Sequence, residues 1–452
     1  MTQDARIHTL SEEKPVKAVL KLGVPLTMGM MIMVAYNLTD TFFIGLLHDD
    51  YQFAAVNLAY PLMMITTALS NMVGTGASSL MARSMGAGDT DKANRTLTCG
   101  YVMTVVLGVV IAFLGLIFLG PLVRLLGAKS HTFTPTCQYA GVILAGTVFT
   151  MGNYTFGQLL RAEGSVKESV GVMLAGTLVN LVLDPVFIFV LHMNVMGAAV
   201  ATIIGNAVAA LLAVSFYVRK KTILSLRKDA IIPQAAIVKE IFFVGIPATL
   251  ETLMTSCAYV LLNNLAVSYG ELYVAAMGVS QKIMTVGNYV YQGFAAGTQP
   301  LMGYNYGAGR YSRMLACLKA NIMVTCLIEL VIVVIYGFGA EALVSVFIST
   351  PEVIAIGAQV LRANMLVLPF VGSISSSRSA FQAMGRPFDA LGITILRQIV
   401  MYMPFLLIFN HFFGFNGLIH AQPVSDAIMC IVAVTHLVRV LRSLERTHAY
   451  EQ

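Results

Sequence analysis

Two aspartates stand inside apolar stretches of the chain, each with oxygen-bearing neighbours. Asp40 lies within Tyr36-Asn-Leu-Thr-Asp40-Thr, and Asp184 lies within Asn180-Leu-Val-Leu-Asp184-Pro185. Residues four apart share one face of a helix, so Asn180 and Asp184 are expected to face the same way. Carboxylate and amide oxygens suit a hard cation such as Na⁺, while two nearby carboxylates can share a proton because like charges raise one pKa. The pattern predicts a site for a small cation.

The apolar stretches around these acids are long enough to cross a membrane, which makes each acid a functional candidate. An ionisable group inside a span costs about 2.5–3.5 kcal/mol on insertion scales. Thr202, near the start of the next apolar stretch, is expected at the same depth as Asp40, Asn180 and Asp184. If sodium is the ion, these four side chains are its predicted ligands. Pro185 has no backbone N–H, which frees the carbonyl of the residue four before it to join them.

The second half of the chain carries a different set of charges inside its apolar stretches. Glu251 and Lys282 fall in neighbouring stretches. They could pair and neutralise each other, or Glu251 could face a cavity and attract cations. Four further charges are expected to pair or to reach the membrane surface: Glu329, Arg362, Arg378 and Arg397.

Composition places the whole chain in a membrane. Of the 452 residues, 57% are apolar and only 11% are charged, whereas a soluble domain has about 25% charged residues. The net charge of +6 is spread over short loops, so a nucleic-acid partner is not expected. The six cysteines form no CxxC pair, and most lie in apolar stretches. A soluble enzyme, a disulfide scaffold and a disordered chain are all disfavoured.

A window of about 20 apolar residues, the length that crosses a bilayer, finds twelve spans. They lie near 20–47, 53–80, 96–120, 134–159, 168–192, 196–218, 239–268, 273–300, 315–338, 355–382, 388–410 and 417–440. Lys and Arg concentrate in the segments that precede odd-numbered spans and at the C-terminus, so both termini are predicted to be cytoplasmic. Termini on the same side require an even number of spans, which twelve satisfies.

The two halves of the chain repeat one another at an offset of 221 residues. Gly76 matches Gly297, and Gly86-Ala-Gly88 matches Gly307-Ala-Gly309. The fold class predicted is therefore all-α, with twelve transmembrane helices in two parallel six-helix repeats. Many transporters place a substrate site near the interface of such repeats. The predicted domains are an N-lobe at 1–218, a cytoplasmic linker at 219–238 and a C-lobe at 239–452.

Several motifs together resemble the multidrug and toxic compound extrusion (MATE) family of antiporters. They are Leu22-Gly-Val-Pro25, Asp40-Thr-Phe-Phe-Ile-Gly45, Arg161-Ala-Glu-Gly164, Asn180-Leu-Val-Leu-Asp184-Pro185, Gly197-Ala-Ala-Val-Ala-Thr202 and Gly303-Tyr-Asn-Tyr-Gly-Ala-Gly309. The resemblance covers about 18–440. It implies two lobes forming a V, and export of drugs and organic cations in exchange for Na⁺ or H⁺.

The resemblance also implies roles for individual residues. In the branch with an N-lobe cation site, the coupling residues match Asp40, Asn180, Asp184 and Thr202, and Tyr139 matches a tyrosine near that site. Another branch uses a C-lobe glutamate, which matches Glu251, together with an aspartate in span ten. Because 355–382 contains no aspartate, coupling is expected in the N-lobe. The residues expected to bind substrate are Tyr36, Asn37, Asn153, Glu251 and Lys282.

The remaining expectations concern partners and competing functions. Small-molecule drugs and the lipid bilayer are the expected partners of a monomer that needs no cofactor beyond its coupling ion. One alternative is a lipid-linked oligosaccharide flippase of the same superfamily, although buried acids and twelve spans argue against it. A membrane-embedded enzyme is the other alternative, but the sequence has no DDxxD, HExxH or GxSxG motif. The predicted function is export, not catalysis.

Overall fold

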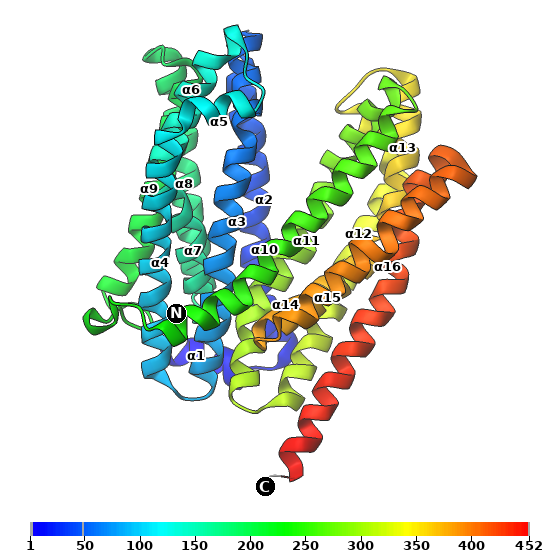
Figure 1. Cartoon of the computed structure of the whole chain (residues 1–452). Helices are drawn as coiled ribbons and strands as arrows, with labels where there is room; N and C mark the ends of the chain where they lie inside the picture. The colour runs from blue at the N-terminus through cyan, green and yellow to red at the C-terminus, as the bar shows by residue number, and fades with distance from the viewer. Residues whose placement is uncertain (1–2, 48, 451–452) are drawn as a thin grey trace. The chain divides into compact units, whose positions relative to one another are not determined.

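The computed structural model describes residues 3–47 and 49–450, and all regular structure in these two ranges is helical. The helices form two compact units, which are described separately (Figure 1). Unit 1 comprises residues up to His8 together with Met28–Ile246, and unit 2 comprises Thr9–Thr27 together with the chain from Pro247 onward. The all-α prediction is confirmed.

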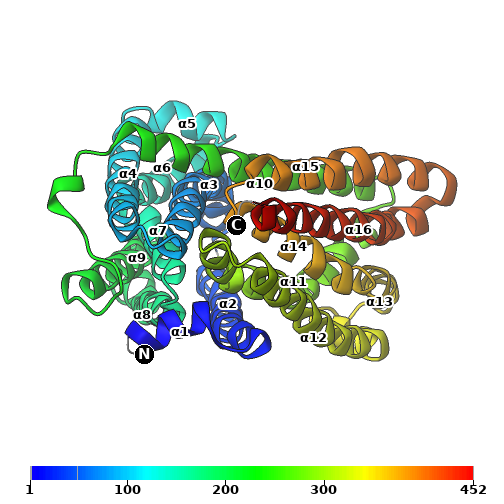
Figure 2. The same ribbon diagram turned by 90° about the horizontal axis from the view of Figure 1, so that it is seen from below.

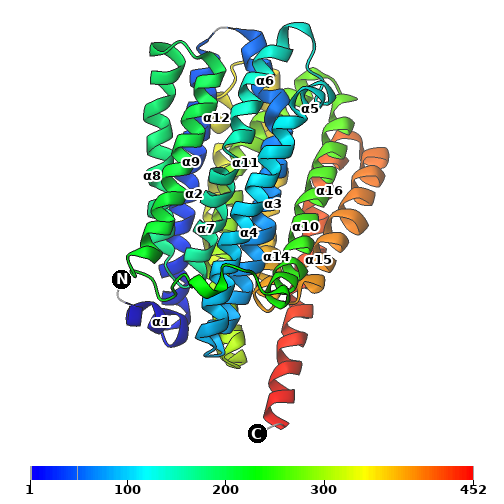
Figure 3. The ribbon, with the colours of Figure 1, turned by 60° about the vertical axis from the view of Figure 1, so that its left-hand side comes forward.

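Unit 1 is a bundle in which α7 is central. Figure 2 looks along the helices and shows α3, α4, α8 and α9 around α7, all of which contact it. Figure 3 shows α8 and α9 running side by side. The helices that lie wholly in this unit are α3 (Asp50–Gly86), α4 (Thr90–Ile117), α5 (Leu119–Leu125), α6 (Ser130–Ala145), α7 (Thr147–Ala162), α8 (Val166–Pro185), the π-helix η1 (Val186–Val190), α9 (Asn194–Val218) and the short 3₁₀ turn η2 (Lys228–Ala230).

Unit 2 is organised around α11, which contacts α12, α13 and α14. The helices that lie wholly in this unit are α11 (Glu271–Gly307), α12 (Tyr311–Ser345), α13 (Pro351–Met365), α14 (Leu368–Ala383), α15 (Pro387–Ile395), the π-helix η3 (Leu396–Tyr402) and α16 (Met403–Tyr450). Three helices contribute residues to both units: α1 (Gln3–Ser11), α2 (Pro15–Gly45) and α10 (Ala235–Val267).

Each of the twelve predicted spans falls on helix. Among residues 3–47 and 49–450, eight helices are long and apolar enough to cross a membrane, or nine if the bent pair α13–α14, with its 47° kink, is counted as one span. The predicted span at 134–159 is broken at Gly146 into α6 and α7, and the span at 273–300 lies in α11, whose many glycine and polar residues lower its hydropathy. The last two predicted spans meet in α16. Gly414 has a φ of 58° and a ψ of −140°, which are not helical values, so the helix is kinked at this residue.

Apolar side chains cover the outer surfaces of several helices. On α4, Val106, Val110 and Phe113 are exposed at helical spacing, and on α12 Phe338 is 91% exposed. Large apolar surfaces of this kind are stable only against lipid or another apolar partner. Together with the long apolar helices, they make this a multi-pass membrane protein.

Two long helices are shared between the units. The first helix of each repeat divides next to its proline, so that α2 changes unit after Thr27 and α10 changes unit after Ile246. Glycines permit the close contacts involved. A Cβ on Gly245 of α10 would lie 2.1 Å from the Met72 carbonyl oxygen of α3, and a Cβ on Gly297 of α11 would lie 2.7 Å from the Leu22 carbonyl oxygen of α2. Side chains at these positions would hold the helices apart.

The predicted linker at 219–238 is docked onto unit 1. The backbone N–H of Ser225 donates to Asn94 Oδ1 over 2.7 Å, and Arg227 forms ion pairs with Asp91 and Asp229. Most of this segment therefore belongs to a compact unit instead of joining two lobes freely, and its last residues begin α10. The physical reason is that its polar groups find partners on α4.

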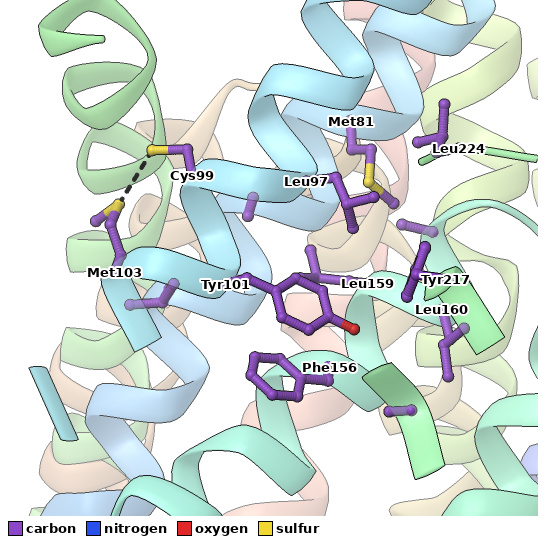
Figure 4. Packing of buried hydrophobic residues seen from close by; sticks show 14 of the residues in the cluster. Met81, Leu97, Cys99, Tyr101, Met103, Phe156, Leu159, Leu160, Tyr217 and Leu224 are labelled. Atoms are coloured by element: carbon purple, nitrogen blue, oxygen red, sulfur yellow. Dashed lines mark hydrogen bonds between the residues drawn. The ribbon is translucent and has the colours of Figure 1, made fainter. Parts of the chain in front are cut away.

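An aromatic cluster fills the core of unit 1 beside this docked segment. Figure 4 shows the Tyr101 ring of α4 against Phe156 of α7; the two rings stack with centroids 3.9 Å apart. Tyr217 of α9 meets Tyr101 edge-on, and Leu159 and Leu224 are buried in the same cluster. The cluster joins α4, α7 and α9 to the segment that follows α9.

Candidate functional site

Three of the four predicted cation ligands lie together in unit 1. Asn180 Nδ2 is 3.3 Å from Asp184 Oδ1 on α8 and 3.3 Å from Thr202 Oγ1 on α9. Asp184 is fully buried and Asn180 is 3% exposed. The arrangement gathers a carboxylate, an amide and a hydroxyl inside a membrane-spanning bundle, which is chemistry suited to a proton or a small hard cation.

Glycine contacts allow α8 and α9 to bring these side chains together. A Cβ on Gly205 of α9 would lie 2.6 Å from the Gly176 carbonyl oxygen and 2.9 Å from the Asn180 Cβ. Gly176 makes the reciprocal contact, at 2.6 Å from the Gly205 carbonyl oxygen. Because neither helix has a side chain at this crossing, Asn180 can reach Thr202 across it.

Asp184 also stands where α8 changes its winding. The α-helix ends at Pro185, and the π-helix η1 follows at once, with the Leu191 N–H bonded to the Val186 carbonyl over 2.9 Å. Short π-helical segments inside helices are frequent at functional sites. From the sequence, Pro185 was expected to free a backbone carbonyl, but the π-helix that follows it was not predicted.

The other residues predicted for the site in this half either have side chains that the structure does not describe or form contacts with other residues. The side chains of Asp40, Tyr36 and Asn37 on α2 are outside the part that the structure describes. Tyr139 of α6 is buried, and its hydroxyl lies 3.8 Å from the Met63 sulfur. Asn153 of α7 donates to Asn206 Oδ1 of α9 over 2.8 Å, and Asn206 in turn donates to Thr150 over 3.2 Å.

The described residues contain no group of three or more His, Cys, Asp or Glu side chains that could hold a metal ion. The predicted site has a different ligand set, a carboxylate with an amide and a hydroxyl, and in this arrangement the amide nitrogen of Asn180 donates to the other two. Such a set fits Na⁺ or a proton better than a transition metal. The cation-binding role of these residues stays a prediction.

In unit 2, Glu251 is paired with a residue that the sequence did not indicate. Its Oε2 accepts a hydrogen bond from Gln382 over 3.0 Å and lies 3.5 Å from an Arg378 nitrogen, both on α14. Glu251 is 3% exposed. Lys282, the partner considered from sequence, is exposed on α11. A pair with Lys282 is therefore wrong as a description of this structure, because α14 supplies a nearer guanidinium.

A second buried ion pair joins η3 to α16. Arg397 and Asp426 form two hydrogen bonds, at 2.6 and 2.9 Å, and the Asp426 side chain is 1% exposed. At the repeat offset of 221, these positions correspond to Gly176 and Gly205 of unit 1. A comparison of the two halves of the sequence would have shown that the charges are present in one half only.

The other charges expected to pair or to reach the membrane surface have different outcomes. Arg397 pairs, as expected, and Arg362 pairs with Glu341. Glu329 lies in the middle of α12 and not near a helix end.

The motif Arg161-Ala-Glu-Gly164 forms a buried polar cluster between α7 and α8. Glu163 accepts hydrogen bonds from the Ser165 hydroxyl over 2.8 Å and from the Leu224 N–H over 3.2 Å. Burial nevertheless raises the pKa of the Glu163 carboxyl to about 7. Arg6 of α1 lies nearby, bonded to Glu168 at 2.7 Å and to the Lys221 carbonyl at 2.8 Å. This cluster fixes the segment after α9.

These features define a class of protein: a polytopic α-helical membrane protein built from two repeats, with ionisable groups buried among its helices. A family model described as MatE matches residues 25–186 and again residues 247–408, so each match begins at one of the prolines where a helix changes unit. The chain belongs to the MatE family. The resemblance found from the sequence is confirmed.

Relatives and solved structures extend over almost the whole chain. The multidrug export protein MepA of Staphylococcus haemolyticus is 27% identical over 432 residues, covering 96% of this chain and 95% of the relative. MepA of Staphylococcus aureus is 27% identical over 440 residues, covering 97% of each. An outward-facing structure of a multidrug resistance MATE family transporter of the MOP superfamily has a TM-score of 0.92 at 28% identity, covering 97% of this chain and 98% of that one. A MOP superfamily transporter from Pyrococcus furiosus has a TM-score of 0.91 at the same identity and coverage.

Proposed function

We propose that this protein is a cation-coupled antiporter that exports lipophilic, often cationic compounds by alternating access. The observation that carries the proposal is the buried Asp184 carboxylate, grouped with Asn180 and Thr202 inside a membrane bundle. The relatives described as multidrug export proteins support export as the direction and drugs as the substrate class. Both the oxygen set and the burial are compatible with Na⁺ or H⁺ as the coupling ion.

The same proposal assigns the residues of the cycle. Asp40, Asn180, Asp184 and Thr202 bind the coupling ion, with Tyr139 close to them, and Tyr36, Asn37, Asn153, Glu251 and Lys282 contact substrate. The protein acts as a monomer in the bacterial inner membrane with both termini in the cytoplasm. Binding of the cation from outside favours the outward-open state, and its release to the cytoplasm allows drug to load.

The test is ethidium efflux in proteoliposomes that carry either a Na⁺ gradient or a pH gradient. Wild-type protein should respond to one of the two gradients, which identifies the ion. Asp184→Asn should abolish gradient-driven efflux and leave folded protein in the membrane. The matched control is Asp49→Asn, an exposed position at the start of α3 where asparagine caps the helix as well as aspartate does. Normal efflux by Asp184→Asn would refute the proposed site.

A further inference from the structure

Glu329 is a buried acid whose carboxylate has no partner in the part of the chain that the structure describes. It lies near the middle of the 35-residue helix α12, is 0% exposed, and neither of its oxygens has a hydrogen-bond partner among the described residues. Because α12 is one of the membrane-spanning helices, this places an acid deep in the bilayer region. The sequence had suggested that it would pair or reach the surface, and the structure shows neither.

The space that the Glu329 side chain occupies is provided by a glycine of the neighbouring helix. A Cβ on Gly287 of α11 would lie 3.6 Å from Glu329 Oε2 and 2.8 Å from a Leu368 methyl carbon of α14. The other half of the chain has no such acid: at the repeat offset, Glu329 corresponds to Gly108 of α4. A Cβ on Gly108 would lie only 2.8 Å from the Val148 Cα, so helix backbone fills the equivalent space.

The charges around Glu329 do not compensate a carboxylate. The titratable groups within electrostatic range are Tyr291 of α11 and, on α12 itself, Cys326 and Tyr336. None of them carries positive charge. An unpaired carboxylate in such surroundings would cost several kcal/mol, and a buried acid avoids this by holding a proton.

Three arginines on other helices of unit 2 are each already paired, and Lys282 of α11 is exposed. Arg378 of α14 faces Glu251, Arg397 of η3 is bound to Asp426 of α16, and Arg362 of α13 bonds Glu341 near the end of α12. Within the described part of the chain, none of these guanidinium groups is bonded to the Glu329 carboxyl. Ionisation of Glu329 would therefore require the helices of unit 2 to shift and bring a guanidinium to it.

We propose that Glu329 is a proton-binding site inside unit 2, occupied in the conformation described here and emptied when α11, α12 and α14 repack. On binding, a proton forms one O–H bond with a carboxylate oxygen; on release it returns to water, and no other bond changes. The site is separate from Asp184 and Glu251. Only its exchange of that proton during transport rests on the proposed antiport function.

Infrared spectroscopy of the whole reconstituted protein tests the occupied state directly. At pH 7, wild-type protein should show the carbonyl band of protonated carboxylic acids. Glu329→Gln should lower the intensity of that band by the contribution of one acid, as a wild-type minus variant difference spectrum shows, whereas Glu341→Gln, an exposed acid on the same helix, should leave it unchanged. A band of equal intensity in Glu329→Gln and in wild type would overturn the proposal, because Glu329 would then be ionised at rest.

Transport and stability measurements separate the outcomes. Glu329→Gln should lower gradient-driven ethidium efflux several-fold and flatten its pH profile, while Glu329→Leu should keep the wild-type melting temperature, since it removes an acid without a partner. If efflux by Glu329→Gln keeps the wild-type pH profile, Glu329 takes no part in transport, and proton exchange at this site is refuted. If wild-type protein itself exports nothing under either gradient, the antiport proposal fails while the infrared result still decides the proton-binding site.

Discussion

At the residue scale, the buried acids of unit 2 differ in whether a positively charged side chain lies beside them. Glu251 and Asp426 have guanidinium partners, whereas Glu329 has none among the residues that the structure describes. A paired charge loses much of its ability to attract a ligand, because its field is cancelled close by. The role of Glu251 in substrate binding therefore depends on how firmly Arg378 holds it.

Replacement of Glu251 distinguishes these roles. Glu251→Gln should weaken export of cationic compounds several-fold more than export of neutral ones, because only cations gain from the carboxylate. Competitive efflux of a cationic and a neutral dye from the same proteoliposomes measures the difference. Glu352→Gln, at the exposed start of α13, is the control. Equal loss for both dyes would identify the Glu251–Arg378 pair as purely structural.

Glu163 gives unit 1 a pH dependence with a definite sign. Burial raises its pKa from 4.5 to about 7. The folded state therefore holds a proton that the unfolded state has lost between these values, so stability falls as pH rises through this window. Below pH 4.5 Glu163 is protonated in both the folded and the unfolded state. Above pH 7 it is ionised in both, and the loss of folding stability has reached its full size. A shift of this size corresponds to about 3 kcal/mol.

Trypsin cleavage within 219–230 reports this effect, because the Glu163 carboxyl accepts the Leu224 N–H. Wild-type protein should be cut faster above pH 7 than Glu163→Gln at the same pH. Below pH 5 the two should be cut alike. Since both proteins are compared at each pH, the pH dependence of trypsin itself cancels. Identical cleavage at every pH would contradict the raised pKa.

At the element scale, the two repeats use different means to join their fifth and sixth spans. In unit 1 the helices α8 and α9 touch through Gly176 and Gly205, and the predicted ion ligands lie one turn away. In unit 2 the corresponding positions carry the Arg397–Asp426 pair. Close backbone contact leaves room for a polar site beside it, whereas an ion pair fills that room with its own side chains.

Removing one partner of the unit 2 pair should leave an uncompensated buried charge. Arg397→Met is expected to destabilise the protein by about 3–5 kcal/mol, and the double variant Arg397→Met/Asp426→Leu should recover most of the loss. Thermal unfolding of the purified protein measures both. Arg362→Met removes an exposed pair and should cost about 0–1 kcal/mol. A double variant as unstable as the single one would show that packing, not charge, sustains this contact.

At the scale of the whole molecule, a repeat with helices that change unit at Pro25 and Pro247 suggests where movement would be absorbed. Packed units do not deform continuously, so a transporter built from them switches between discrete arrangements. An ion can shift that equilibrium only through its different affinity for the two states. This is the physical basis for expecting ion-dependent opening.

Spin labels on two exposed positions test this expectation. One label is placed at Asp49 of unit 1 and the other at Glu271 of unit 2, and their separation is measured with and without the coupling ion. The separation should increase when the ion is supplied, and Asp40→Asn should abolish the response. An unchanged separation in protein that still transports would leave only bending within one unit.

The sequence predicted the fold class closely because its signals are physical requirements of a membrane. Long apolar stretches predicted the helices, and the repeat offset aligned Gly76 with Gly297, which proved to be contact points of their helices. The spacing of Asn180 and Asp184 predicted their shared face. The bend between α13 and α14 and the break at Gly146 were missed, since both occur inside long apolar stretches, although Pro369 in the first turn of α14 stands beside the bend.

By itself, the sequence determined the all-helical membrane fold, the repeat and the group formed by Asn180, Asp184 and Thr202, because these depend on hydropathy and on spacing along a single helix or its neighbour. Only the tertiary structure decided that Arg378 pairs with Glu251, that Glu329 is left without a partner, and that α2 and α10 divide between the units. These outcomes depend on which helices pack together across more than a hundred residues of chain. Hydropathy and local spacing do not encode such contacts, since any buried face can in principle meet any other.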